Sequence, residues 1–213
     1  MDYDRSMLEA PPQGLNTLKA ADIFPEQKSS LITIKVSNDA EAILNQGYTP
    51  QNALVLGREQ VVMNGLVKLL NPRCVFEIGT AWGGTTYNFF LNTEEGCEIF
   101  TLDELEQPIA RPEVATMFEH PRVHRLRGNS LRFDFSPWER SCDLIFIDGN
   151  HDAVTIRCDT ENAFRMIRPG GIILWHDDIP LFPGVQQWLL ELERHEPVSH
   201  IENTALAIWR CPL

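Results

Sequence analysis

Short apolar runs alternate with segments of helical periodicity over most of this chain. Several of the runs are continuous rather than alternating, which is typical of strands that helices cover on both faces. The runs predict five strands, at residues 74–78, 98–102, 123–126, 144–147 and 171–175.

The segments between these runs carry apolar residues at three- and four-residue spacing, which predicts helices. Helices are expected at residues 54–70, 84–91, 112–119 and 153–167, and a further one contains the stripe Val185, Trp188, Leu189 and Leu192. Residues 198–201 and 206–209, around a turn at Glu202-Asn203, are typical of an antiparallel hairpin. The pattern predicts an α/β fold: a seven-stranded, mostly parallel sheet with a C-terminal antiparallel hairpin and helices on both faces.

The first fifty residues differ from the rest. They lack a clear period and carry Pro11, Pro12, Gly14, Pro25 and Pro50. We expect a partly ordered N-terminal extension over residues 1–50, with a short helix near residues 39–45. Residues 51–213 then form one domain, because a chain of 213 residues is long enough to bury a core.

Composition limits the classes of partner. The formal net charge of -12 argues against nucleic acid or an anionic membrane surface. No apolar run approaches the roughly 20 residues that a membrane span needs, and the first residues lack the pattern of a signal peptide. Five cysteines without Cys-x-x-Cys spacing are typical of reduced thiols, so we expect a cytoplasmic protein. The oligomeric state stays open, a homo-oligomer included.

The segment from Cys74 to Thr86 reads as a strand, an acid, a glycine-bearing turn and the start of a helix. This arrangement brings backbone close to a ligand at the carboxyl end of a strand. The next predicted strand leads to Asp103, and a carboxylate there is the usual partner of ribose hydroxyls. An NAD-linked oxidoreductase is disfavoured, because the first Gly-x-Gly pair of the dinucleotide motif is missing.

The turn Glu77-Ile-Gly-Thr-Ala-Trp-Gly-Gly-Thr85 resembles the first motif of class I S-adenosylmethionine-dependent methyltransferases, most nearly that of catechol O-methyltransferase and its relatives. The resemblance implies their Rossmann-like fold and S-adenosylmethionine as cofactor. It also implies a set of cofactor-binding residues: Glu77, Gly79, Gly83, Thr85, Asp103, Asn129, Ser130 and Asp148. Within this set, Asn129 and Ser130 follow the third strand, where relatives place residues against adenine.

Three carboxylates follow the fourth and fifth predicted strands: Asp148, Asp177 and Asp178. Because the carboxyl ends of adjacent parallel strands lie together, we expect these side chains to gather in one small volume. Their repulsion calls for a cation, and an all-oxygen set suits Mg²⁺, with Mn²⁺ or Ca²⁺ next. The alternative is that Asp177 and Asp178 only cap the turn before Pro180.

The segment from Phe146 to Asp152 and the two acids after the fifth strand are similar to the macrolide-sugar branch of the family, which includes macrocin-type O-methyltransferases. The catechol type carries an acid and an amide at that place instead. The resemblance implies that Asp148, Asp177 and Asp178 bind the metal. It also implies that His151 is the base, a role that the ordinary pKa of histidine suits.

We therefore predict a divalent-metal-dependent O-methyltransferase that moves a methyl group from S-adenosylmethionine to a hydroxyl of a small molecule. The acceptor is a phenol or catechol, a sugar or a natural-product intermediate, and residues 1–50 are expected to serve as a lid on its pocket. Two alternatives remain open. One is a metal-independent methyltransferase, and the other is a non-catalytic S-adenosylmethionine-binding accessory protein, since residues 146–152 are also similar to cephalosporin hydroxylase-type proteins.

Overall fold

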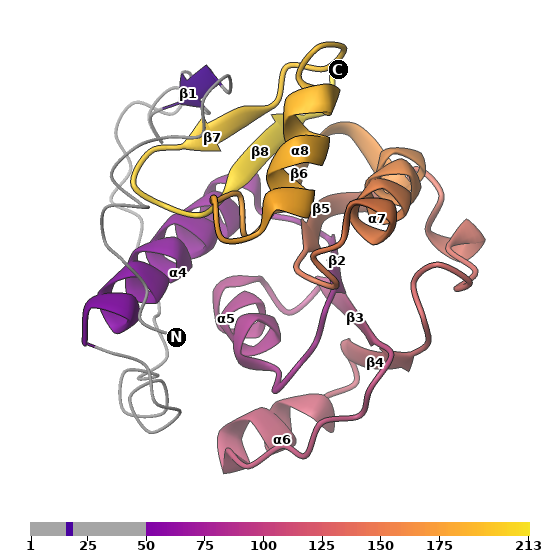
Figure 1. Ribbon diagram of the computed structural model, residues 1–213. Helices are drawn as coiled ribbons and strands as arrows, with labels where there is room; N and C mark the ends of the chain where they lie inside the picture. Colours follow the sequence, from indigo (N-terminus) through magenta and orange to yellow (C-terminus); the bar gives the residue numbers. More distant parts are fainter. Residues whose placement is uncertain (1–15, 19–49) are drawn as a thin grey trace.

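The computed structural model describes residues 16–18 and 50–213, with side chains from residue 57 onward. One eight-stranded sheet forms the centre, with helices on both faces (Figure 1). The strand order across the sheet is β1-β7-β8-β6-β5-β2-β3-β4. The strands are β1 Asn16–Leu18, β2 Cys74–Ile78, β3 Glu98–Asp103, β4 Val123–Arg127, β5 Cys142–Ile147, β6 Ile167–Trp175, β7 Ser199–Ile201 and β8 Ala207–Arg210.

The strands β2 to β6 run parallel, and β8 joins β6 as an antiparallel strand. β7 pairs with β8 in antiparallel orientation and completes the hairpin. All seven predicted strands are present, so the predicted fold class is confirmed. The eighth strand, β1, was not indicated by the sequence pattern, and it adds a parallel edge beside β7.

The helices follow the predicted alternation. They are α4 Pro50–Leu70, α5 Gly84–Asn92, α6 Pro112–Phe118, α7 Ala153–Met166 and α8 Pro183–Leu192, with a short 3₁₀ helix at Ser136–Trp138. Helix α7 ends one residue earlier than predicted, because Ile167 already pairs with Cys142 of β5. The predicted helix near residues 39–45 lies outside the described residues, as does most of the predicted extension.

The sheet divides its side chains between two cores. In β5, Ile145 and Ile147 pack with α7 and α8, whereas Leu144 and Phe146 pack with α4, α5 and α6. Successive residues of a strand point to opposite faces, so a continuous apolar run buries both faces. The loops that follow the carboxyl ends of the parallel strands meet at one edge of the sheet.

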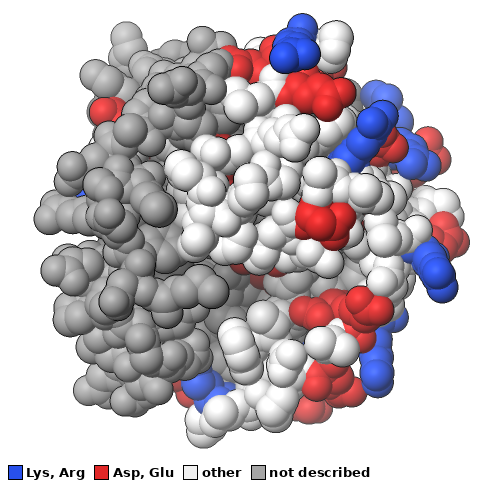
Figure 2. Space-filling model, in the orientation of Figure 1, with Lys and Arg blue, Asp and Glu red and all other residues white. Residues whose placement is uncertain are grey.

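One face of the described residues carries both signs of charge (Figure 2). On the face drawn in Figure 2, Lys and Arg side chains lie interspersed with Asp and Glu rather than in one patch. Within residues 16–18 and 50–213, none of the helices combines the length and the apolar character that crossing a bilayer requires.

Candidate functional site

The turn after β2 depends on two glycines. Gly79 has a φ of 106°, and a Cβ there would lie 2.0 Å from the carbonyl oxygen of Asp148, so only glycine fits. Gly83 precedes α5 with a φ of 77°, and a Cβ there would lie 2.7 Å from the ring of Phe118. The turn thereby packs against the end of β5, where the amide of Asp148 donates to the carbonyl of Ile78 at 2.8 Å.

Glu77 supports this turn from inside the protein. Its Oε2 atom accepts hydrogen bonds from the hydroxyls of Thr86 and Thr101, and Thr101 is its direct partner in β3. Burial raises the pKa of Glu77 to about 8, although the two hydroxyls oppose the shift. Its Oε1 atom is buried without a hydrogen-bond partner among the described residues. Thr85, predicted to contact the cofactor, lies half-buried in the first turn of α5.

Asp103 orders the two loops beside it. Its Oδ2 atom accepts from the amide of Ala81 at 2.8 Å, and its Oδ1 atom accepts from the amide of Leu105 at 2.9 Å. Asn129 has a similar role after β4, since its Oδ1 atom accepts from the amide of Leu131 at 3.0 Å. Both leucines are exposed, at 62% and 45%. Neither leucine was predicted as a site residue. Each lies two positions beyond a polar residue that follows a predicted strand, and this spacing could have indicated them.

Ser130 lies near a buried carboxyl on α7. Asp159 is fully buried, and burial raises its pKa to about 6, while the hydroxyl of Ser130 opposes that shift. The Oδ2 atom of Asp159 also lies 3.5 Å from the place where a Cβ on Gly149 would stand. Helix α7 therefore brings a carboxyl to the loops that follow β4 and β5.

Three of the predicted residues converge beyond the ends of β5 and β6. Asp148, His151 and Asp177 each offer one ligand atom, and these atoms all lie within 4.8 Å of one another. The Nε2 atom of His151 lies 2.7 Å from the Oδ2 atom of Asp177. Two carboxylates and an imidazole are a donor set that fits a divalent cation. Among the described residues, these three are therefore the candidate cation ligands.

Asp178 lies apart from these three residues. Asp177 has a left-handed backbone with a φ of 61°, and the two consecutive aspartates reach different partners. The carboxylate of Asp178 is fully buried, and its Oδ2 atom lies 3.1 Å from the Nδ1 atom of His200 in β7. The convergence expected from the sequence thus holds for Asp148 and Asp177, whereas Asp178 contacts the C-terminal hairpin. Its role as a metal ligand stays a prediction.

His176, which directly precedes Asp177, also lies against this cluster. Its Nδ1 atom lies 3.3 Å from the Oδ1 atom of Asp148 and 3.2 Å from the Oδ1 atom of Asp177. Strand β6 ends at Trp175, so alternation no longer sets the direction of the next side chain. The Nε2 atom of His176 lies 3.0 Å from the Oε2 atom of Glu59, a residue of α4 that no motif singled out.

Proximity and burial shift the pKa values of this cluster. Burial lowers the pKa of His176, but the carboxylates of Asp148, Glu59 and Asp177 outweigh burial and raise it well above its usual value. The hydrogen bond to Asp177 raises the pKa of His151. Burial acts to raise the pKa of Asp177, but His176 and His151 hold it well below the usual range. An ionised Asp177 therefore stands between two imidazoles that bind protons readily.

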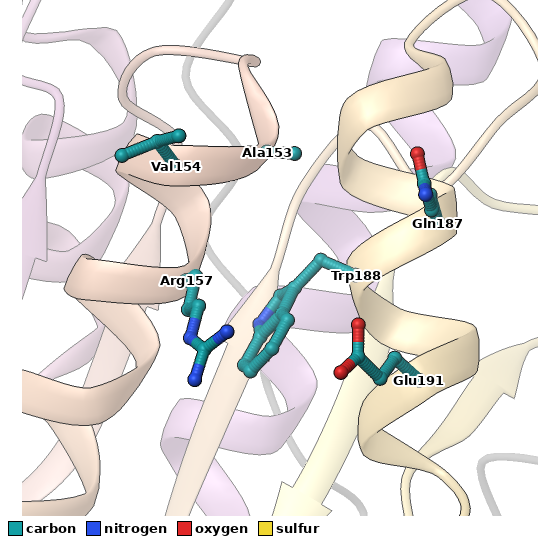
Figure 3. A pocket seen from close by; sticks show the side chains of 6 residues that line it. All are labelled: Ala153, Val154, Arg157, Gln187, Trp188 and Glu191. Carbon is teal, nitrogen blue, oxygen red and sulfur yellow. The ribbon is translucent and has the colours of Figure 1, made fainter.

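A hollow lies between α7 and α8 and is drawn in Figure 3. It has a volume of about 380 Å³, and the guanidinium of Arg157 lies 5.3 Å from the ring centroid of Trp188 at its wall. None of the residues predicted for the cofactor, the metal or the base lines this hollow. The candidate site is therefore the strand-end cluster.

A family model described as "Methyltransferase domain" matches residues 76–178. The match begins in β2 and ends at Asp178, so it contains both the glycine turn and the acidic cluster. Over this range the chain is similar to methyltransferase domains. The matched range also contains Asp103, Asn129 and Ser130, so every residue predicted for the cofactor, the metal or the base lies within it. The resemblance inferred from the glycine turn is confirmed.

Solved methyltransferases share the fold of this domain. The O-methyltransferase from Bacillus cereus in complex with SAH is 20% identical, with a TM-score of 0.59 over 84% of this chain and 93% of that one. The O-methyltransferase TomG from Streptomyces achromogenes, involved in tomaymycin synthesis and solved with SAM, is 16% identical. Its TM-score is 0.61, over 85% of this chain and 93% of that one. The SAH-bound methyltransferase PaMTH1 from Podospora anserina is 16% identical, with a TM-score of 0.63 over 91% of this chain and 93% of that one. At these identities the likeness shows the fold, which is the predicted class I methyltransferase fold.

One curated relative has a name that denotes a different activity. Spermidine synthase 2 from Arabidopsis thaliana is 27% identical to this chain over 138 residues. That segment covers 57% of this chain and 41% of the relative, so the chain spans less than half the length of this curated protein.

Proposed function

We propose that this chain transfers a methyl group from S-adenosylmethionine to a hydroxyl of a small molecule, with a divalent cation at the acidic cluster. The observation that carries the proposal is the convergence of Asp148, His151 and Asp177 within 4.8 Å. The cluster adjoins the glycine turn, because Gly79 packs directly against the carbonyl of Asp148. Methyl transfer requires oxygen, methyl and sulfur to align, so a cofactor turn in contact with an acceptor site suits it.

The cofactor would lie along the ends of β2, β3 and β4. S-adenosylmethionine supplies a methyl group on a positively charged sulfur. The carboxylate of Asp103 would accept hydrogen bonds from the ribose, and Asn129 or Ser130 would bind the adenine amine. Leu105 and Leu131 would cover apolar faces of the adenine ring, since both are exposed beside these polar residues. The named SAM and SAH complexes of similar fold support this placement.

The turn residues have supporting roles in the same proposal. Gly79 and Gly83 keep side chains out of the space that the turn needs, and Thr85 lies in the first turn of α5, directly after it. Glu77 holds Thr86 and Thr101 below the turn. The predicted contact of Glu77 with the cofactor would be indirect, because its carboxyl is fully buried.

Asp148 and Asp177 would hold the cation, Mg²⁺ before Mn²⁺ or Ca²⁺. A divalent cation polarises an acceptor hydroxyl and lowers its pKa. Asp178, predicted as the third ligand, would have to exchange its contact with His200 for one with the cation. We therefore assign the stronger role to Asp177.

His151 would accept the proton that the acceptor hydroxyl releases. Its Nε2 atom is held by Asp177, which leaves Nδ1 as the proton-accepting atom. The ring also contacts Phe182, with ring centroids 4.3 Å apart, so two neighbours fix its orientation. A histidine that a carboxylate orients through one nitrogen is a recurring general base.

A metal-independent methyltransferase is the second candidate. The observation in its favour is the position of His176, whose Nδ1 atom lies within 3.3 Å of carboxylate oxygens of both Asp148 and Asp177. A protonated imidazole there offsets the repulsion that otherwise calls for a cation. A non-catalytic accessory protein is the third candidate, and it rests on the sequence resemblance alone.

We extend the proposal to the setting of the reaction. The acceptor is a free phenol, catechol, sugar or natural-product intermediate, and the net charge of -12 disfavours nucleic acid and anionic membranes. Residues 1–50 would shape the acceptor pocket ahead of a catalytic domain at residues 51–213. The spacing of the cysteines supports a cytoplasmic protein, and a homo-oligomer is compatible with all of this.

Calorimetry and a transfer assay test the proposal. S-adenosylhomocysteine and NADH are titrated separately, and labelled S-adenosylmethionine is then offered with phenol, catechol and sugar acceptors in Mg²⁺. The expected result is binding of S-adenosylhomocysteine, none of NADH, and label on at least one hydroxyl acceptor. Binding of NADH alone would restore the oxidoreductase. Binding of S-adenosylhomocysteine without any transfer would favour the accessory protein.

A further inference from the structure

Glu59 ties helix α4 to the acidic cluster. Its side chain is buried, and each carboxylate oxygen has its own partner. Oε1 accepts from the amide of Ala205 at 2.6 Å, and Oε2 lies 3.0 Å from the Nε2 atom of His176. Glu59 lies outside residues 76–178, so this contact adds a residue that the family match does not contain.

His176 stands between Glu59 and the two aspartates of the candidate cation site. With Nε2 fixed by Glu59, its Nδ1 atom faces the Oδ1 atoms of Asp148 and Asp177 at 3.3 Å and 3.2 Å. The other oxygen of Asp177 lies 2.7 Å from His151. Each oxygen of Asp177 therefore has a histidine neighbour, and one of those histidines is anchored through Glu59 to a separate helix.

We infer that Glu59 and His176 form a positioning pair, in which Glu59 fixes the ring of His176 and His176 fixes the carboxylates of Asp148 and Asp177. The inference rests on the proposed cation site and deepens it. Partners that orient metal ligands typically contribute about 10–100-fold to metal affinity or activity. Glu59 acts through His176, so its effect should appear in the cation site and not in cofactor binding.

The surface offers a matched control pair. The Nε2 atom of His124 lies 2.6 Å from the Oε2 atom of Glu98, between neighbouring strands β4 and β3. Their side chains are 37% and 50% exposed, in contrast to 16% and 3% for His176 and Glu59. Changing Glu98 therefore measures the effect of losing a histidine–glutamate contact away from the candidate site.

The experiment compares Glu59→Gln with Glu98→Gln. Both changes keep the size of the side chain and remove its negative charge. Five quantities are measured on each variant: the Mg²⁺ dissociation constant with S-adenosylhomocysteine bound, kcat and KM for methyl transfer, the affinity for S-adenosylhomocysteine, and Tm. For Glu59→Gln we expect weaker Mg²⁺ binding or a lower kcat by about 10–100-fold, with cofactor affinity unchanged. For Glu98→Gln we expect all five to match the wild type.

Three outcomes separate this inference from the proposed function. A folded Glu59→Gln variant that binds Mg²⁺ and turns over like the wild type overturns the positioning pair and leaves the proposed function intact. If Glu59→Gln does not fold, His176→Gln carries the same expectation and the same contradiction. Wild-type turnover that is equal in excess EDTA removes the cation site, and the pair with it, before any variant is needed.

Discussion

The Nε2 atom of His151 lies 2.7 Å from the Oδ2 atom of Asp177. The predicted base and a predicted metal ligand are therefore in direct contact, although 25 positions separate them in the chain. The contact arises because β5 and β6 are adjacent parallel strands, whose loops meet at one edge of the sheet. It makes the function of each residue depend on the other.

Replacing His151 tests its role as the base. We expect His151→Ala to slow methyl transfer by roughly 10²–10⁴-fold, because the proton of the acceptor then has no side-chain acceptor. The affinity for S-adenosylhomocysteine should change little. Single-turnover kinetics with saturating cofactor measure the loss, and His195→Ala, at an exposed position, is the control. Turnover of His151→Ala at the wild-type rate would remove it as the base.

Asp177 and Asp178 should differ although they are consecutive. Asp177 belongs to the candidate ligand set, whereas Asp178 is buried against His200. We expect Asp177→Asn to weaken Mg²⁺ binding by at least about 10-fold, as loss of a charged ligand implies. Asp178→Asn should weaken it less and lower Tm more, because it disturbs a buried pair. Calorimetry and thermal unfolding measure both, and equal losses of Mg²⁺ affinity would restore Asp178 as a full ligand.

Asp103 should matter for the cofactor and not for the cation. A hydrogen bond to a charged group is worth about 1.5–3 kcal/mol, so Asp103→Asn should weaken S-adenosylhomocysteine binding by about 10-fold or more. Affinity for Mg²⁺ should stay near that of the wild type. Glu104→Gln, the exposed neighbour, is the matched control. Unchanged cofactor affinity in Asp103→Asn would show that the ribose lies elsewhere.

Glu77 should make stability depend on pH. Its pKa in the folded protein is raised to about 8 from an ordinary value of 4.5, so folding favours the protonated form. This contribution to stability is complete below about pH 4.5 and is lost as the pH rises through about 8. The free energy of unfolding should thus fall across this window, and Glu77→Gln should flatten the slope. Urea unfolding between pH 5 and 8.5 measures it, with Glu119→Gln as the exposed control; parallel slopes for Glu77→Gln and the wild type would contradict it.

Much of the fold could be predicted from the sequence, for an identifiable reason. Strands such as β2 and β5 are apolar over nearly every residue because helices cover both faces, and that pattern is visible in one sequence. Strand β1 is only three residues long and belongs to a segment rich in proline, so no periodicity marks it.

The site could be predicted where a motif follows a strand and not where packing brings in a distant segment. Asp148 and Asp177 follow predicted strands, and their convergence follows from strand adjacency alone. Glu59 belongs to a helix whose periodicity reports only its apolar face, so its contact with His176 depends on tertiary packing. The pairing of Asp178 with His200 likewise depends on how the C-terminal hairpin packs beside β6.

Methyl transfer in the presence and absence of free divalent cation measures the central proposal most directly. Labelled transfer to a catechol or sugar acceptor is followed in Mg²⁺, after addition of excess EDTA, and after Mg²⁺ is restored, with binding of S-adenosylhomocysteine measured in each condition. We predict that EDTA abolishes transfer, that Mg²⁺ restores it, and that the cofactor product binds in all three conditions. Transfer that continues at the same rate in EDTA would contradict a cation held by Asp148 and Asp177.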